Sequence, residues 1–192
     1  MTTVSKKQKQ GVSIKTPLKG ESKMKNLYFA YGSNMHPETM EARSRGFAKP
    51  LGHAVLDDYR LSERLFADID FSEGDQVHGL LWEIDDRTLA SLDICEGVAG
   101  GLYERYEVPV TLKDNTCLVA IVYEMTYQAK QARMESIFPL IYAIECAIGA
   151  FQHNVPVDHL YQSRLAEDAM KAKEFIRNKK TTRKSINYKR KK

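Results

Sequence analysis

Strand-like patterns dominate this chain up to Tyr127, and helical patterns dominate after it. Residues 105–112 alternate apolar and polar side chains, and Asp114-Asn115 makes a turn into a second run over 117–127. These two runs predict a β-hairpin. Residues 139–151 and 157–176 show helical spacing instead. Strands followed by helices predict an α+β domain with a curved or barrel-like sheet.

Further strands are expected before that hairpin. Four short apolar runs bounded by turn-forming residues predict them: 27–31, 54–61, 66–69 and 77–84. Asp57-Asp58 is expected to turn the second of these strands, and residues 73–75 (EGD) predict a turn of their own. A short helix is expected at 36–44, and a second helix, capped by Asp85 or Asp86, is expected to end at Cys95.

Length and composition exclude several classes of protein. The chain has 192 residues, which suits one domain, and its 43% of hydrophobic residues is typical of a soluble globular protein. The longest apolar stretch, 137–150, contains Glu145 and a proline and is too short to span a bilayer. The N-terminus carries lysines with no apolar run after them, so neither a secretory signal nor a membrane partner is expected.

Cysteines and histidines do not form a recognisable site in the sequence. The cysteines are odd in number and no pair has C-x-x-C spacing, which argues against a disulfide framework and a zinc site and favours a cytoplasmic protein: Cys95, Cys117 and Cys146. The histidines lie singly on separate segments, so no metal site is predicted from them: His36, His53, His78, His153 and His159.

Charge divides the chain into three parts. Residues 1–25 carry seven Lys and one Glu, and residues 171–192 carry eleven Lys or Arg and one Glu. Since the whole chain has a formal charge of +4, residues 26–170 carry −12. We therefore expect a disordered basic segment at 1–23, a folded domain at 24–170 and a basic tail at 171–192. The basic ends are interpreted as solvated segments, with contact to nucleic acid or another anionic partner as the alternative.

Two segments contain residue types that suit a catalytic site. The first is Tyr31-Gly32-Ser33-Asn34-Met35, which lies between a predicted strand and a predicted helix. Glycine there allows close approach of the backbone, and amides at a helix start can hold an anion such as a carboxylate. An ordinary strand-to-helix turn would have the same pattern.

The second segment is 92–98 (LDICEGV), which is followed by Gly101-Leu102-Tyr103. Glu96 lies where a helix ends and a glycine-rich loop begins. A carboxylate facing the negative end of a helix has a raised pKa, which suits a general acid/base near neutral pH. Tyr103 could donate a hydrogen bond into the same pocket. The alternative is a solvated Glu beside a helix-capping glycine.

Taken together, these segments resemble the γ-glutamylcyclotransferase family, including its AIG2-like relatives. The order and spacing of four segments carry the resemblance: 27–35 (LYFAYGSNM), 77–83 (VHGLLWE), 92–98 (LDICEGV) and 101–103 (GLY). A closing stretch that includes 139–142 and 160–165 is similar to the family's C-terminal helical region. The resemblance covers about 25 to 165, and Y-G-S-N combined with the downstream LD-x-x-EG-V and G-x-Y is a strong signature.

The resemblance implies a small mixed β-barrel flanked by helices. It also implies an enzyme that cleaves a γ-glutamyl amide to 5-oxoproline and a free amine or amino acid, with no metal or redox cofactor required. Carried over by position, Glu96 is the catalytic acid/base. The implied substrate-binding residues are Tyr31, Gly32, Ser33, Asn34, Met35, Tyr103 and Tyr142. A homodimer is compatible with the resemblance.

Two departures from the family pattern leave the substrate range open. Cys95 stands where an aromatic or polar residue is common before the Glu. Ser62-Glu63 follows Tyr59-Arg60-Leu61, after which an aromatic residue is often found. The leaving amine is not predicted. Two other functions stay open, which are a non-catalytic small-ligand domain on the same fold and a protein that acts through its basic ends.

Overall fold

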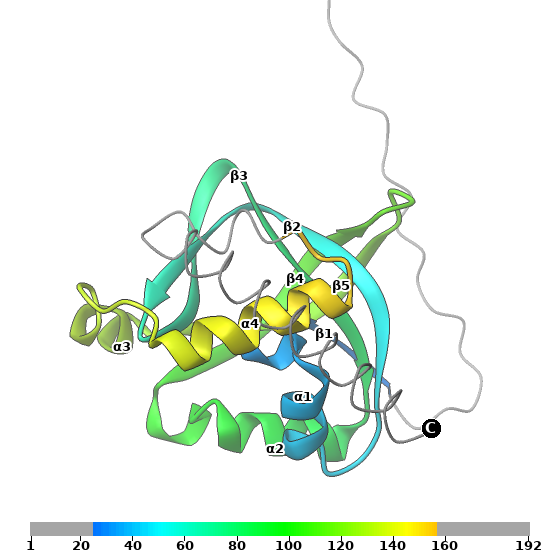
Figure 1. Ribbon diagram of the computed structural model, residues 1–192, viewed down its shortest axis with the longest axis horizontal. Helices are drawn as coiled ribbons and strands as arrows, with labels where there is room; N and C mark the ends of the chain where they lie inside the picture. Colours follow the sequence, from blue (N-terminus) through cyan, green and yellow to red (C-terminus); the bar gives the residue numbers. More distant parts are fainter. Residues whose placement is uncertain (1–24, 157–192) are drawn as a thin grey trace, which may run out of the picture.

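Five strands close into a barrel in the order β1-β3-β2-β4-β5, and helices pack around it (Figure 1). The structure is a computed structural model and describes residues 25–156. The strands are β1 Asn26–Ala30, β2 Ala48–Arg64, β3 Phe66–Ile84, β4 Tyr103–Leu112 and β5 Cys117–Met125. The basic segments predicted at 1–23 and 171–192, and the helix predicted at 157–176, lie outside the described residues.

The barrel is mixed because β1 has one antiparallel and one parallel neighbour. It pairs antiparallel with β3 from Asn26↔Ile84 to Ala30↔Leu80, and parallel with β5 at Tyr28↔Ile121. The other pairs are antiparallel, and β4 with β5 forms the hairpin predicted from the alternating pattern. The expected small mixed barrel flanked by helices is therefore confirmed.

β2 and β3 form one long hairpin where the sequence predicted shorter, separate strands. The strand predicted at 54–61 lies within β2, and those at 66–69 and 77–84 lie within β3. The chain reverses at Leu65, which has a left-handed φ of 72°. No Gly, Pro or Asn marks that position, so it carries no turn signal.

The turn predicted at 73–75 does not end a strand, because these residues lie inside β3. The register passes from Asp57↔Gln76 to Tyr59↔Phe71, so Asp58 alone faces residues 72–75. Gly74 donates its N–H to Asp58 Oδ1 at 2.9 Å, and Asp58 has a φ of 62°. The turn-forming residues therefore make a bulge, and the bend predicted at Asp57-Asp58 is confirmed.

Helices and 3₁₀ turns occupy the connections: η1 Ser33–Met35, α1 Pro37–Arg43, α2 Asp86–Cys95, η2 Val98–Gly100, α3 Tyr127–Ala132 and α4 Leu140–Gln152. The helices predicted at 36–44, before Cys95 and at 139–151 are confirmed. Asp85 caps α2 by accepting the N–H of Thr88 at 2.9 Å. α3 was not predicted, because Tyr127 extends the apolar pattern of β5. No helix within 25–156 has the length and apolar character needed to cross a membrane.

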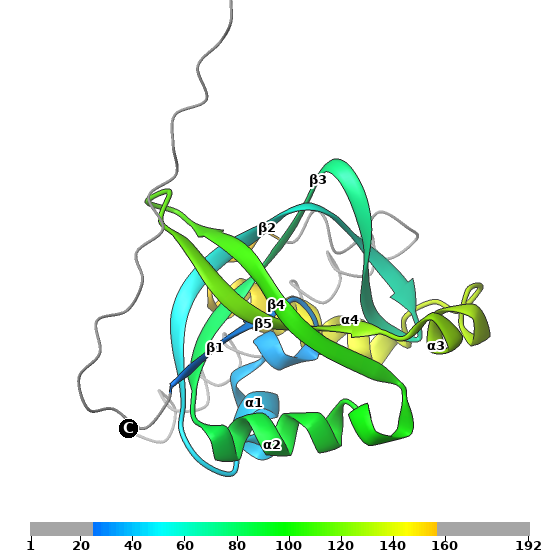
Figure 2. The same ribbon diagram turned by 180° about the vertical axis from the view of Figure 1, so that it is seen from behind.

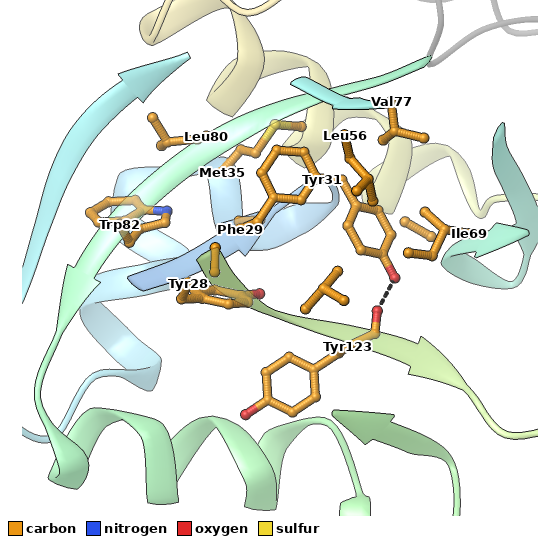
Figure 3. Close-up of a cluster of buried hydrophobic side chains, with 14 of the residues drawn as sticks. Tyr28, Phe29, Tyr31, Met35, Leu56, Ile69, Val77, Leu80, Trp82 and Tyr123 are labelled. Carbon is orange, nitrogen blue, oxygen red and sulfur yellow. Dashed lines mark hydrogen bonds between the residues drawn. The ribbon is translucent and has the colours of Figure 1, made fainter. Parts of the chain in front are cut away.

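The core fills the inside of the barrel (Figure 3), and its fully buried members include Phe29, Leu56 and Leu80. From behind, the β4–β5 hairpin crosses the barrel, with α2 below it (Figure 2). On the opposite side, α4 packs directly on the loop after β1. A Cβ on Gly149 would lie 2.3 Å from His36 N, so only glycine allows this approach. The packing of α4 therefore fixes the position of this loop.

Candidate active site

A cavity of about 110 Å³ lies where the loop after β1, the end of α2, the start of β4, the tip of the β2–β3 hairpin and α4 meet. One water needs roughly 10–15 Å³, so the cavity has room for a small ligand of several heavy atoms. Its lining is mostly polar and aromatic: Tyr28, Tyr31, Gly32, Ser33, Asn34, Arg43, Phe66, Ala67, Cys95, Glu96, Leu102, Tyr103, Tyr123 and Tyr142.

Glu96 lies directly after α2, where its backbone N–H donates to Leu92 O at 2.8 Å. Its side chain lines the cavity and is 15% exposed. Glu96 Oε1 accepts a hydrogen bond from Asn34 Nδ2 at 2.8 Å and lies 3.5 Å from Arg43 Nη1. The two sequence segments that suit a catalytic site are therefore joined by a hydrogen bond.

The pKa of Glu96 is raised above its usual value. Burial is the largest cause, and the Arg43 guanidinium and the Asn34 amide oppose it by favouring the charged form. The expected direction is therefore confirmed, with burial rather than the helix end as the main cause. A carboxylate with a raised pKa and two polar partners can both take up and return a proton.

Asn34 connects three side chains around the carboxylate. Its Nδ2 donates to Tyr28 Oη at 2.7 Å and to Glu96 Oε1, while its Oδ1 accepts from Arg43 Nη1 at 2.6 Å. The side-chain amide thus uses both of its hydrogens and its oxygen, which fixes its orientation. Asn34 is itself buried.

Gly32 lies in close contact with two other elements of the site. A Cβ at this position would lie 2.8 Å from Tyr142 Oη and 2.9 Å from the Cβ of Ala67. Glycine is therefore required for the loop, α4 and the hairpin tip to come this close. Tyr142 is beside the loop although it is more than a hundred residues away in sequence.

Tyr103 and Tyr142 hold Ala67 from two sides. Tyr103 Oη donates to Ala67 O at 2.7 Å, and Ala67 N donates to Tyr142 Oη at 2.9 Å. Burial raises the pKa of both hydroxyls, so both stay protonated at neutral pH. These two tyrosines fix the wall of the cavity that Ala67 forms.

Seven of the eight predicted site residues line the cavity, and Met35 does not. The Met35 side chain is fully buried in the core (Figure 3), and its N–H donates to Gly32 O at 3.0 Å. Tyr31 lines the cavity, but its hydroxyl donates to the backbone oxygen of Tyr123 (Figure 3). Ser33 is buried beside Gly32.

Comparison with known proteins gives the family. The family described as "Gamma-glutamyl cyclotransferase, AIG2-like" matches residues 28–138. A Bos taurus protein named gamma-glutamylcyclotransferase is 33% identical over 152 residues, covering 72% of this chain and 76% of that protein. The chain belongs to the γ-glutamylcyclotransferase family. The family and the type of enzyme predicted from the sequence are therefore confirmed.

A further relative and two solved structures agree with the assignment to the γ-glutamylcyclotransferase family. A Homo sapiens protein named gamma-glutamylcyclotransferase is 30% identical over 151 residues, covering 72% of this chain and 76% of that protein. A solved structure named gamma-glutamyl cyclotransferase has a TM-score of 0.60 at 26% identity, over 79% of this chain and 99% of its own. A human structure described as uncharacterized also has a TM-score of 0.60, at 28% identity, over 78% of this chain and 86% of its own.

Several residues that line the cavity were not predicted from the sequence: Tyr28, Arg43, Phe66, Ala67 and Tyr123. Arg43 is the last residue of α1, and its only sequence signal is a positive charge at a helix end. Tyr28 looks like an ordinary strand residue, and the hairpin tip enters the site only through the pairing of β2 with β3.

His53 and His78 lie on separate segments of the sequence, but the pairing of β2 with β3 brings their side chains together. His53 Nε2 and His78 Nδ1 lie 2.9 Å apart, and neither residue lines the cavity. Over residues 25–156, no three His, Cys, Asp or Glu side chains gather in a way that would hold a metal ion.

Proposed function

We propose that this chain converts a γ-glutamyl amide to 5-oxoproline and a free amine or amino acid, with Glu96 as the general acid/base. The observation that carries the proposal is the position of Glu96. Its carboxylate lines a small polar cavity, has a raised pKa, and is hydrogen-bonded to the Y-G-S-N loop. The curated relatives named gamma-glutamylcyclotransferase support the same class of reaction.

The reaction takes place within the substrate. The α-amine of the γ-glutamyl group attacks its own γ-carbonyl carbon, so a C–N bond closes a five-membered lactam. The original amide C–N bond breaks, and its nitrogen leaves with one added proton. Glu96 takes the proton that the attacking nitrogen loses and returns it to the leaving nitrogen, so protons balance over the cycle. General acid/base help of this kind is typically worth roughly 10²–10⁴-fold.

Positioning accounts for much of the remaining rate. The substrate must fold until its amine meets its carbonyl, and a well-oriented intramolecular reaction gains about 7–11 kcal/mol. A cavity closed by Gly32, Ala67 and Tyr142 would favour this folded form over an extended one. In this folded form, the α-amine and the γ-carbonyl of the substrate lie close together and near the Glu96 carboxylate.

The start of η1 suits an anion. Met35 N and His36 N are bound to Gly32 O and Ser33 O at 3.0 Å each. The backbone N–H groups of the residues before Met35 have no acceptor within the η1 turn, as at any helix start. In the proposal, the amides of Gly32, Ser33 and Asn34 face the substrate carboxylate or the oxyanion that forms at the γ-carbon. The Met35 amide, which is already bound, takes no part.

A substrate panel tests the proposal. The full chain is incubated with γ-glutamyl dipeptides and γ-glutamylamines, and 5-oxoproline is measured. Each active substrate is then compared with its N-acetyl derivative, whose blocked nitrogen cannot attack. We expect release from at least one free-amine substrate and none from its acetylated form. Release from the acetylated form would contradict intramolecular attack, and no release from any member would contradict the proposed function.

A further inference from the structure

Asp68 is a fully buried carboxylate that lies outside the cavity lining. It is on β3, near the tip of the β2–β3 hairpin. Asp68 Oδ2 accepts from Arg64 Nη1 at 2.6 Å, and Oδ1 accepts the backbone N–H of Met125 at 2.8 Å. One side chain therefore joins the end of β2, the start of β3 and the end of β5.

Asp68 belongs to an ion-pair cluster that continues to α3. Arg64 Nη2 also donates to Asp70 Oδ2 at 2.7 Å, and Lys130 Nζ donates to Asp70 Oδ1 at 2.9 Å. Lys130 further donates to Glu124 Oε1 and lies 3.7 Å from Asp68 Oδ2. In both ribbon views α3 lies beside the tip of the hairpin (Figures 1 and 2). The cluster thus anchors the tip to α3 and β5.

The residue before Asp68 forms one wall of the cavity. Tyr103 and Tyr142 bind the two backbone groups of Ala67, and a Cβ on Gly32 would contact the Ala67 Cβ. Phe66 also lines the cavity and packs against Tyr142, with ring centroids 5.4 Å apart. A displacement of β3 at Asp68 would therefore move the cavity wall that contacts the loop after β1.

We propose that Asp68 is a positioning residue that shapes the substrate-binding cavity, because its ion pair with Arg64 fixes the Ala67 wall beside Gly32. This inference rests on the proposed function of the cavity. Removing the charge of Asp68 would leave the partly buried Arg64 guanidinium with Asp70 as its other carboxylate partner, and the strand can then shift to relieve the lost ion pair. Glu96, Asn34 and Arg43 lie on other elements and would keep their own contacts.

Asp68→Asn and Asp70→Asn form a matched pair of variants. Both remove one carboxylate from the cluster and from the same strand, and both carboxylates bind Arg64. Asp68 is adjacent to the cavity wall, whereas Asp70 is 23% exposed and two residues further away. We expect Asp68→Asn to raise KM about tenfold with kcat within about threefold of wild type, because uniform substrate binding is lost. We expect Asp70→Asn to lower the melting temperature with KM within about threefold.

An unchanged KM in folded Asp68→Asn would overturn the proposal, and so would an equal rise of KM in Asp70→Asn. Arg64→Lys provides a second test in case Asp68→Asn does not fold. It keeps the charge but loses the planar fork that holds both carboxylates, so it too should raise KM more than kcat falls. If its KM is unchanged, the proposal is wrong.

Amide spectra separate this inference from the proposed function. The backbone amide resonance of Gly32, which lies next to Ala67, is recorded by NMR in wild type and both variants without substrate. We expect it to shift in Asp68→Asn and to stay in place in Asp70→Asn. A shift together with an inactive wild-type protein would contradict the proposed reaction alone, whereas an unmoved Gly32 resonance in Asp68→Asn would contradict the positioning role.

Discussion

Asn34 donates a hydrogen bond of 2.8 Å to Glu96 across 62 residues of sequence. This bond connects the loop that follows β1 to the carboxylate that follows α2. It also sets the state of Glu96, because a donor to a carboxylate favours its charged form against the effect of burial. Burial and the polar partners of Glu96 therefore together decide at which pH it can accept a proton.

The pH dependence of the wild-type reaction follows from the raised pKa of Glu96. A general base must be deprotonated, so kcat/KM falls as the pH drops through its pKa. The acid limb of the profile should therefore lie above the ordinary glutamate value of 4.5. The profile is measured by 5-oxoproline release with the best substrate of the panel. An acid limb at or below the ordinary value would contradict the role of burial.

Replacing Asn34 by Ala removes a donor to the Glu96 carboxylate. The pKa of Glu96 should then rise further, and the acid limb of kcat/KM should move to higher pH. A hydrogen bond to a charged group is worth about 1.5–3 kcal/mol, which corresponds to a loss of roughly 10–150-fold in kcat/KM at pH values below the acid limb. Ser72→Ala, on the exposed bulge of β3, serves as a control that should keep the wild-type profile. An acid limb that does not move would exclude Asn34 from this role.

The charge of Arg43 lowers the pKa of Glu96 and so opposes the effect of burial. Arg43→Gln should therefore also move the acid limb of kcat/KM to higher pH. The Arg43 side chain is 31% exposed and 3.5 Å from Glu96, so solvent weakens the interaction. We expect a loss of about tenfold in kcat/KM, part of it from the lost hydrogen bond to Asn34. Arg43→Lys keeps the charge and should lose less. Equal losses in Gln and Lys variants would show that the charge is not what matters.

Gly32→Ala should impair the site through crowding. Its new Cβ would lie 2.8 Å from Tyr142 Oη, and overpacking of this kind typically costs about 1–3 kcal/mol. Adding Tyr142→Phe removes the crowded oxygen, so the double variant should lose less activity than the two single losses combined. A double-mutant cycle on kcat/KM measures this coupling. Strictly additive losses would mean that Gly32 and Tyr142 do not constrain one another.

The site could be predicted largely from its two sequence motifs. Glu96 follows the end of α2 and Asn34 lies in the short turn η1 after β1, and such connections carry local signals in glycine and capping residues. Arg43 and Tyr28 carry no such signal, because they reach the carboxylate only through the packing of α1 and β1 around the loop. Met35 belongs to the same motif, but its apolar side chain packs in the core and not against the cavity.

The fold shows the same division between local and long-range information. The β4–β5 hairpin and the Asp85 cap were predicted because their signals lie within a few residues. The length of the β2–β3 hairpin was not predicted, because its reversal at Leu65 has no turn residue and its glycine and acidic residues form a bulge instead. Strand pairing over the full hairpin is what carries Ala67 to the cavity.

The central claim is that Glu96 transfers the proton, and Glu96→Gln tests it most directly. Glutamine has the same shape and its oxygen can still accept from Asn34, so far-UV circular dichroism and the melting temperature should stay close to wild type. The measurement is the rate of 5-oxoproline release by both proteins from the same γ-glutamyl substrate. The account predicts a loss of roughly 10²–10⁴-fold in kcat with the fold intact. Turnover within about threefold of wild type would contradict it.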